Sequence, residues 1–260
     1  MNILNEIAER TRQRIAEKAA KIPLSEMKNR AESMPINGDF PFYKALCGKD
    51  ISFICEVKKA SPSKGIIAED FPYLDIARDY ENAGAAAISC LTEPFWFKGS
   101  DEILQEITNT VKIPVLRKDF TISEYMIYEA KTLGASAVLL ICSILDEQEL
   151  GNYLSLAHSL GMSALVETHN EDEIELAVKI GAKIIGVNNR DLKSFSVDVG
   201  NSARLREKIP RDRIFVSESG ISTAADVQKL REIGANAALV GEALMRADDK
   251  TKKLKELRGN

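Results

Sequence analysis

Side chains that could transfer protons follow several of the apolar runs in this sequence. Five runs end in charged or amide residues, in the triplets Glu56-Val57-Lys58, Arg117-Lys118-Asp119, Glu167-Thr168-His169, Asn188-Asn189-Arg190 and Glu218-Ser219-Gly220. Lysines among carboxylates are typical of general acid–base chemistry, because a proton donor and a proton acceptor then share one site. Charges are rarely buried without a partner, so we expect these groups to serve a site. A purely structural ring of ion pairs is the alternative.

Two glycines follow the last two apolar runs in a pattern typical of phosphate binding. Gly220 in Ser219-Gly220-Ile221 and Gly241 in Val240-Gly241-Glu242 each precede a segment with helical periodicity. Uncovered backbone N–H groups and the beginning of a helix bind phosphate well. Glycine also forms simple turns, but the matching positions favour a phosphate site.

Two loops could complete a binding site. Residues 60–65, ASPSKG, form a small-residue loop with Lys64, which is either a mobile lid or an inert connection. Aromatic residues 95–97 and Phe120 follow the second and third apolar runs. Aromatic side chains in such loops suggest a flat organic ligand, although they could instead fill the end of the core.

A repeated strand–helix pattern positions these residues. Eight short apolar runs begin at Ser52, Ala85, Pro114, Ala137, Ser163, Ile184, Ile214 and Ala237, on average about 26 residues apart. The segments between them have helical periodicity, and several end in glycine, at Gly84, Gly134, Gly161, Gly181 and Gly234. Apolar strands that alternate with amphipathic helices predict a parallel sheet covered by helices. Eight such units predict a single α/β domain, a (β/α)8 TIM barrel, in which sites lie at the C-terminal ends of the strands.

The sequence before the first strand predicts an N-terminal helical extension. Residues 1–46 contain an apolar face compatible with a helix, and residues 47–260 contain the eight repeats of the catalytic barrel. The extension either stabilises the barrel or helps to close the active site. Within the barrel, strand alternation predicts that Glu56 and Lys58 point the same way and that Leu116 and Lys118 point inward.

Composition limits the classes of partner. The net charge of -4 argues against nucleic acid and anionic membranes as partners. The sequence has no apolar run as long as a membrane span and no signal-peptide core, so we expect a cytoplasmic protein. The four cysteines have no C-x-x-C spacing and are expected to be reduced. His158 and His169 are expected to serve no site, the latter because we place it on the outward side of its strand or in a loop, and no metal site is expected.

Beyond these patterns, the sequence closely resembles the indole-3-glycerol-phosphate synthase family from end to end. The most specific stretch is FICEVKKASPSKG (53–65), and further stretches are PVLRKDF (114–120), LVETH (165–169), GVNNRDL (186–192), VSESGI (216–221) and LVGEALM (239–245). The resemblance implies a carboxy-lyase of tryptophan biosynthesis that needs no metal or organic cofactor. Its reaction closes a ring, with decarboxylation and dehydration, converting 1-(2-carboxyphenylamino)-1-deoxyribulose 5-phosphate into indole-3-glycerol phosphate.

The resemblance also implies roles for the motif residues. Lys118 is expected to protonate the substrate's ketone oxygen, and Glu167 to handle protons in the dehydration, with Glu56 and Lys58 close by. Which of these four acts in which step stays open.

The resemblance implies the binding residues in the same way. The phosphate is expected at Lys58, Gly220, Gly241 and Glu242; the sugar at Asn188 and Glu218; the anthranilate carboxylate at Ser61 and Arg190; and an aromatic slot at Pro62, Phe97, Phe120 and Leu192. Ser219 is also expected to bind the substrate.

The sequence departs from the family pattern at two places, and other functions stay open. Thr168 stands where relatives often have valine, and Glu242 where they often have serine, which puts a side-chain hydroxyl contact to phosphate in doubt. Alternatives are another phosphorylated-sugar barrel enzyme such as phosphoribosylanthranilate isomerase, a Schiff-base aldolase that uses Lys118, and a non-catalytic phosphate-binding barrel. The partner expected is a small phosphorylated molecule, and the chain could also associate with other tryptophan-pathway enzymes.

Overall fold

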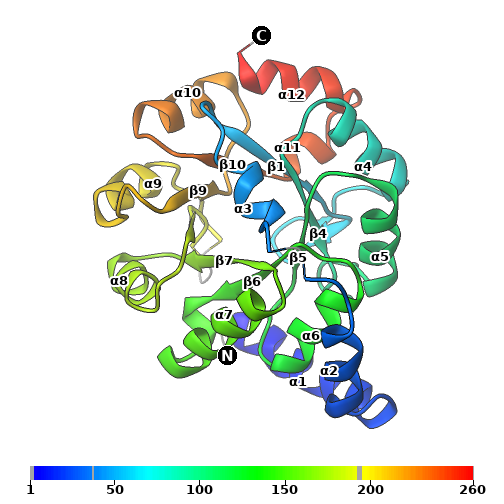
Figure 1. The fold of residues 1–260 in the computed structure, drawn as a ribbon. Helices are drawn as coiled ribbons and strands as arrows, with labels where there is room; N and C mark the ends of the chain where they lie inside the picture. Colours follow the sequence, from blue (N-terminus) through cyan, green and yellow to red (C-terminus); the bar gives the residue numbers. More distant parts are fainter. Residues whose placement is uncertain (1–2, 37, 192–194, 260) are drawn as a thin grey trace.

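The computed structural model describes residues 3–36, 38–191 and 195–259, and its centre is a closed barrel of parallel strands (Figure 1). The eight strands are β1 (Ser52–Val57), β4 (Ala87–Leu91), β5 (Val115–Lys118), β6 (Ala137–Ile141), β7 (Ser163–Thr168), β8 (Ile184–Asn188), β9 (Ile214–Glu218) and β10 (Ala237–Val240). Each strand pairs with the strands before and after it in this series, and β1 closes the ring against β10. The predicted (β/α)8 barrel with an N-terminal helical extension is confirmed.

Helices surround the barrel, as Figure 1 shows. They are α4 (Tyr73–Asn82), α5 (Asp101–Thr110), α6 (Glu124–Thr132), α7 (Glu147–Ser159), α8 (Glu171–Lys179), α9 (Gly200–Leu205), α10 (Ala224–Glu232), α11 (Glu242–Met245) and α12 (Lys250–Arg258), with short 3-10 turns η1 (Cys142–Ile144) and η2 (Arg206–Lys208). Before the barrel come α1 (Ile3–Lys21), α2 (Leu24–Glu32) and α3 (Pro41–Ala45). An antiparallel hairpin, β2 (Ala60–Ser61) and β3 (Gly65–Ile66), follows β1.

Alternation along each strand divides its side chains between two cores. In β1, Ile54 belongs to the core inside the barrel, whereas Phe53 and Cys55 belong to the core between the barrel and its helices. In β5, Leu116 is inside the barrel. Fully burying one large apolar side chain contributes about 1.5–3 kcal/mol, so a register slip that turned each strand over would be costly. This alternation fixes which side of the barrel each strand-end residue reaches.

Local sequence sets where the covering helices begin and end. The side chains of Ser123, Asp146 and Thr223 accept hydrogen bonds from backbone N–H groups in the first turns of α6, α7 and α10. The five glycines predicted to end helices, Gly84, Gly134, Gly161, Gly181 and Gly234, have φ between 71° and 83°. A residue with a Cβ rarely adopts that conformation, so glycine permits the sharp return to the next strand.

The N-terminal helices pack onto the barrel. Helix α1 buries Leu4 and Ile7, and α2 buries Met27 against the side of the molecule where α6 lies. Phe42 of α3 and the following Leu46 are fully buried in the core inside the barrel, next to residues that begin the strands. Because they share the barrel's own cores, we propose that residues 1–46 are an extension of a barrel formed by residues 47–260, and not an independent domain.

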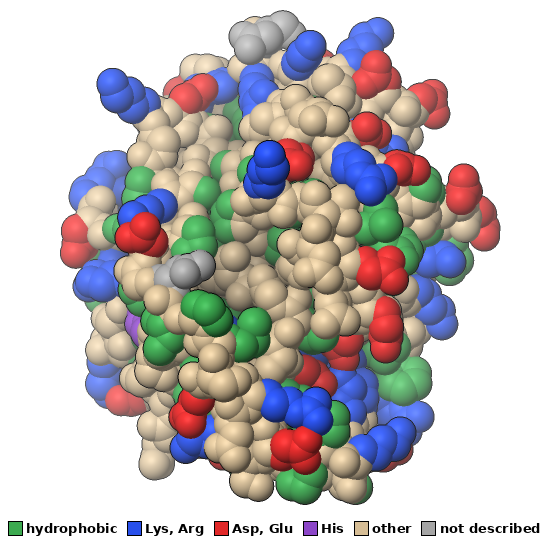
Figure 2. All heavy atoms as spheres, turned by 45° about the vertical axis from the view of Figure 1, so that its right-hand side comes forward, with side chains coloured by type: hydrophobic (Ala, Val, Ile, Leu, Met, Phe, Trp, Pro, Cys, Tyr) green, Lys and Arg blue, Asp and Glu red, His purple; other side chains and the backbone are tan. Residues whose placement is uncertain are grey.

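The surface carries both signs of charge. Lys and Arg side chains are interspersed with Asp and Glu on the face shown in Figure 2. Within the described ranges, no helix is both long and apolar enough to cross a membrane. All four cysteines are free thiols, and Cys55, Cys90 and Cys142 are buried.

Candidate active site

A cavity of about 850 Å³ opens at the C-terminal ends of the barrel strands. Its wall includes every described residue predicted to belong to the site: Glu56, Lys58, Ser61, Pro62, Phe97, Lys118, Phe120, Glu167, Asn188, Arg190, Glu218, Ser219, Gly220, Gly241 and Glu242. Leu192, also predicted, lies outside the described residues. Residues from β1 to β10 contribute, because parallel strands in a closed barrel all end on one rim. Motifs separated by more than a hundred residues therefore meet in one cavity.

Lys118 lies among carboxylates on the inner side of β5. Its Nζ is 3.2 Å from Oε2 of Glu167 and 3.6 Å from Oε2 of Glu218. Burial by itself would lower the pKa of Lys118, but Glu167, Glu218 and Glu56 outweigh burial and hold this pKa above its ordinary value. Lys118 is thus a protonated cation that faces the cavity.

Glu167 is held in its ionised form. Burial would raise its pKa, but Lys118 and His169 outweigh burial and lower it. Oε1 of Glu167 accepts a hydrogen bond from Nδ2 of Asn188 at 3.2 Å. A buried carboxylate with neighbouring cations on both oxygens is a strong hydrogen-bond acceptor for a substrate hydroxyl.

His169 was predicted to serve no site and to lie on the outward side of its strand or in a loop; it lies in the loop directly after β7, but its ring contacts Glu167 of the site. Its Nε2 lies 3.4 Å from Oε1 of Glu167, and its Nδ1 lies 3.0 Å from Oε2 of Glu173. Burial would lower the pKa of His169, but these two carboxylates raise it to about 10. The signal was present in the sequence, because a spacing of two residues gives His169 the same strand parity as Glu167.

Glu218 differs from Glu167 in that its pKa is raised and not lowered. Burial first and then the neighbouring charge of Glu167 raise its pKa to about 8, against the opposing effect of Lys118. Among the described residues, its buried Oε1 has no hydrogen-bond partner. The site thus holds one carboxyl whose pKa is raised close to one whose pKa is lowered. Such a pair can donate and accept protons at one place.

Lys58 and Glu56 form an ion pair on the inner side of β1, as their shared parity predicted. Gly241 lies directly beside this pair. A Cβ at this position would overlap the Glu56 carboxylate and lie 3.0 Å from Nζ of Lys58. Glycine therefore lets the backbone after β10 approach the Lys58 side chain closely.

The rim around the two predicted phosphate glycines is cationic. Glu242 pairs with Nζ of Lys64 at 3.6 Å and with Nε of Arg246 at 3.0 Å. Arg246 lines the cavity but was not predicted from the sequence, since it lies within a helical pattern. Burial would raise the pKa of Glu242, but Arg246 and Lys64 lower it. The Glu242 side chain thus carries its negative charge but is neutralised by these neighbours.

The backbone after β9 is held in an unusual conformation. Ser219 has φ of 70° and Gly220 has φ of 81°. Nδ2 of Asn189 donates to the Ser219 carbonyl at 3.1 Å, while Oδ1 of Asn189 accepts from the backbone N–H and hydroxyl of Ser202. A residue other than glycine at such a positive φ costs of order 1–3 kcal/mol, so the surrounding contacts must hold Ser219 in this conformation.

An apolar wall closes the opposite side of the cavity. Phe97 and Phe120 have ring centroids 6.4 Å apart, and Leu4 and Ile7 of α1 line the same cavity. The hairpin β2–β3 contributes Ser61 and Pro62. Of the two predicted roles for the extension, α1 therefore takes part in enclosing the cavity as well as packing on the barrel.

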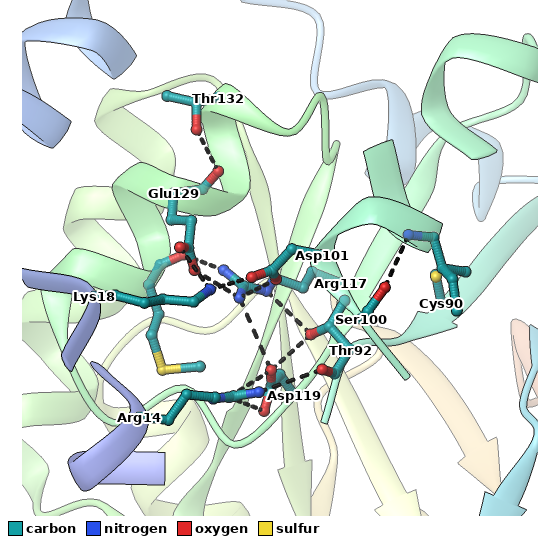
Figure 3. Close-up of polar contacts among 12 residues, drawn as sticks. Arg14, Lys18, Cys90, Thr92, Ser100, Asp101, Arg117, Asp119, Glu129 and Thr132 are labelled. Atoms are coloured by element: carbon teal, nitrogen blue, oxygen red, sulfur yellow. Dashed lines mark hydrogen bonds and ion pairs between the residues drawn. The ribbon is translucent and has the colours of Figure 1, made fainter. Parts of the chain in front are cut away.

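Arg117 was grouped with the rim charges, but it lies outside the barrel wall, because its parity is opposite to that of Lys118. Its NH2 group contacts Asp101 at 2.7 Å and Glu129 at 2.8 Å, as Figure 3 shows. The Arg117 side chain is 1% exposed. The alternative of structural ion pairs is therefore correct for this residue. In the described part of the chain, His, Cys, Asp and Glu side chains form no group of three suited to a metal ion.

Comparisons with known proteins identify relatives along the whole chain. A family model described as indole-3-glycerol phosphate synthase matches residues 4–257. The indole-3-glycerol phosphate synthase of Ruminiclostridium cellulolyticum is 53% identical over 258 residues, which cover 99% of both chains. The enzyme of that name from Endomicrobium trichonymphae is 52% identical over 256 residues, covering 98% of this chain and 99% of the relative.

Solved structures show the same fold at low identity. A 3-hexulose-6-phosphate synthase has a TM-score of 0.66 at 17% identity, covering 80% of this chain and 99% of that one. A variant of the tryptophan synthase α-subunit from Pyrococcus furiosus has a TM-score of 0.63 at 17% identity, covering 82% and 99%. These two likenesses concern the fold alone.

Proposed function

The chain belongs to the indole-3-glycerol phosphate synthase family, and we propose that the cavity at the C-terminal ends of its strands carries out the family's reaction. The protein is a decarboxylating lyase of tryptophan biosynthesis. Its reaction converts 1-(2-carboxyphenylamino)-1-deoxyribulose 5-phosphate into indole-3-glycerol phosphate, CO2 and water. The full-length family match sets aside the isomerase, aldolase and binding-module alternatives. The observation that carries the assignment of the site is the protonated Lys118 between Glu167 and Glu218.

Lys118 is the proposed general acid of ring closure. The ring carbon that bears the carboxylate attacks the ketone carbon, and the ketone oxygen gains negative charge as the new bond forms. A buried ammonium group stabilises that charge and donates the proton. What supports Lys118 is its inward position and the three carboxylates that keep it protonated.

Glu167 and Glu218 are the proposed proton-handling pair for the later steps. Dehydration requires a base for one proton and an acid for the departing hydroxyl group. The ionised Glu167 suits the first role, while the raised pKa of Glu218 suits a proton donor or a hydrogen bond to a sugar hydroxyl. Asn188 and Ser219 would hold the sugar nearby. The ion pair of Glu56 with Lys58 lies on the same rim and could exchange protons with this group.

The phosphate is proposed to bind beside Lys58, Gly220 and Gly241. Lys64 and Arg246 add positive charge around this end of the cavity. Because Glu242 is already paired with both of them, the phosphate would meet its backbone N–H and not its side chain. Oxyanions bind favourably at such a cationic rim with uncovered backbone donors.

The anthranilate ring is proposed to lie in the apolar half of the cavity. Phe97, Phe120 and Pro62 supply flat or apolar contacts, and Leu4 of α1 encloses them. Ser61 and Arg190 would hold the carboxylate before it leaves. Once CO2 begins to form, an apolar environment favours the neutral product over the charged carboxylate.

The location and partners of the chain also belong to this proposal. The small phosphorylated substrate follows from the family. A cytoplasmic location is supported by the biosynthetic role of the relatives. Association with other tryptophan-pathway enzymes rests on the shared pathway.

Lys118→Met tests the assignment of the general acid. We expect kcat, followed by indole absorbance and fluorescence, to fall roughly 10²- to 10⁴-fold while the substrate still binds. Lys118→Arg keeps the cation but donates protons poorly, so it should also bind the substrate and regain little of the rate. Lys179→Met, at an exposed ion pair on α8, is the matched control and should keep the wild-type rate. Lys118→Met with more than about a tenth of wild-type kcat would refute the assignment and make Lys58 the next candidate.

A further inference from the structure

Helix α1 contacts the end of β5 through one buried ion pair. NH2 of Arg14 donates to both carboxylate oxygens of Asp119, at 2.9 and 2.8 Å, and its NH1 donates to the Thr92 carbonyl at 3.3 Å. The Asp119 side chain is fully buried, and that of Arg14 is 12% exposed. One guanidinium nitrogen thus contacts the Asp119 carboxylate and another contacts the Thr92 carbonyl, and two donors on one planar group fix orientation as well as distance.

The Asp119 carboxylate links this contact to the site. Its Oδ1 also accepts the backbone N–H of Phe120 at 2.8 Å, and its Oδ2 accepts the hydroxyl of Thr92 at 2.6 Å. Asp119 directly follows Lys118, and Phe120 lines the cavity. The carboxylate therefore holds the backbone on the C-terminal side of Lys118.

The strand ladder leaves Lys118 with uneven support. On one side it pairs with Leu91 of β4, whereas the β5–β6 ladder ends at Arg117 opposite Val138. The position of the Lys118 backbone relative to β6 therefore depends on how the next residues of the chain are held. The contact between Arg14 and Asp119 supplies a restraint at that point.

The charges behind β5 balance. Three cations, Arg14, Lys18 and Arg117, face three carboxylates, Asp101, Asp119 and Glu129, as Figure 3 shows. Arg117 lies 3.9 Å from Asp119 and already contacts Asp101 and Glu129. Without Arg14, the buried Asp119 carboxylate would therefore turn toward Arg117, and the backbone that follows Lys118 would move with it.

We propose that Arg14 of the N-terminal helix is a positioning residue for catalysis: through Asp119 it fixes the end of β5 that carries Lys118. The proposal rests on the proposed role of Lys118. A displacement of about 1 Å in a catalytic group can reduce the rate about 100-fold. The N-terminal helix thereby contributes to turnover as well as to enclosure of the cavity.

The test compares Arg14→Met with Arg12→Met, whose side chain is exposed on the same helix. We expect Arg14→Met to reduce kcat about 10- to 100-fold, with KM changed less than about threefold, while Arg12→Met keeps wild-type values. A structural role alone would lower the unfolding temperature and leave kcat intact well below that temperature. Arg14→Lys keeps the charge but has one nitrogen, which cannot contact both Asp119 and the Thr92 carbonyl as Arg14 does. This variant should lose about tenfold in kcat, so it decides the matter if Arg14→Met does not fold.

A double variant separates this proposal from the role of Lys118. If Arg14 acts through Lys118, Arg14→Met should change the residual rate of Lys118→Met by less than about threefold. A full additional loss in that background, or wild-type kcat in both folded Arg14 variants, overturns the positioning role. A Lys118→Met enzyme with wild-type rate refutes the general acid itself, and the proposal for Arg14 with it.

Discussion

Replacing Glu218 by glutamine should make the protein more stable at neutral pH, because this carboxyl is buried beside another carboxylate. Its pKa is about 8 in the folded chain and 4.5 ordinarily. Between these values the folded protein keeps a proton that the unfolded chain releases, so stability falls by about 1.36 kcal/mol per pH unit. Glutamine removes this dependence because it has the shape of the protonated acid and does not titrate.

The magnitude depends on the pH. At pH 7, which is 2.5 units above 4.5, the gain of Glu218→Gln should approach about 3 kcal/mol. That gain corresponds to roughly 6–12 °C in unfolding temperature for a chain of this size. At pH 4.5 the unfolded carboxyl is half protonated, so the gain should be small, and well below pH 4.5 both states of the wild-type chain hold the proton and the gain should vanish. Activity should fall, since the variant can no longer release a proton from this position.

Thermal and urea unfolding of wild type and Glu218→Gln at pH 4.5, 6, 7 and 8 measure the effect. Glu102→Gln, at an exposed position in the first turn of α5, is the matched control and should show no pH-dependent gain of this size. A Glu218→Gln variant that is less stable than wild type at pH 7, or whose gain is the same at all four pH values, would refute the reasoning.

Three other features of the site can be tested by substitution or by chelation. Gly241→Val should raise KM strongly in a chain that circular dichroism shows to be folded, because the new side chain displaces the Glu56–Lys58 pair; an unchanged KM would mean that the phosphate binds elsewhere. His169→Asn should lower stability most below pH 6.5, and the difference from wild type should shrink as pH rises toward 10, because stability from a raised histidine pKa is lost on deprotonation; a pH-independent difference contradicts this. Activity should survive exhaustive EDTA treatment, since Lys58 and Lys118 supply the cations; a loss reversed by added Mg²⁺ or Zn²⁺ would argue otherwise.

The sequence by itself determined the barrel and most of the cavity wall. Apolar strands at regular spacing and glycines after the helices specify the repeated unit, because both patterns act locally along the chain. Parity along the strands then places Glu56 and Lys58 on one side and Lys118 on the inner side without knowledge of the tertiary structure. The same rule, applied strictly, would have placed His169 beside Glu167 and Arg117 outside the barrel.

The tertiary structure alone decided the contacts between distant segments and the proton affinities that depend on them. Arg14 meets Asp119 across 105 residues, and no local pattern in α1 distinguishes Arg14 from its exposed neighbour Arg12. Glu167 and Glu218 are both glutamates near the C-terminal ends of barrel strands, β7 and β9. Nevertheless, the pKa of Glu167 is lowered and that of Glu218 is raised. Burial and the positions of Lys118 and His169 in space make that difference, since electrostatic energy depends on distance and surroundings and not on sequence separation.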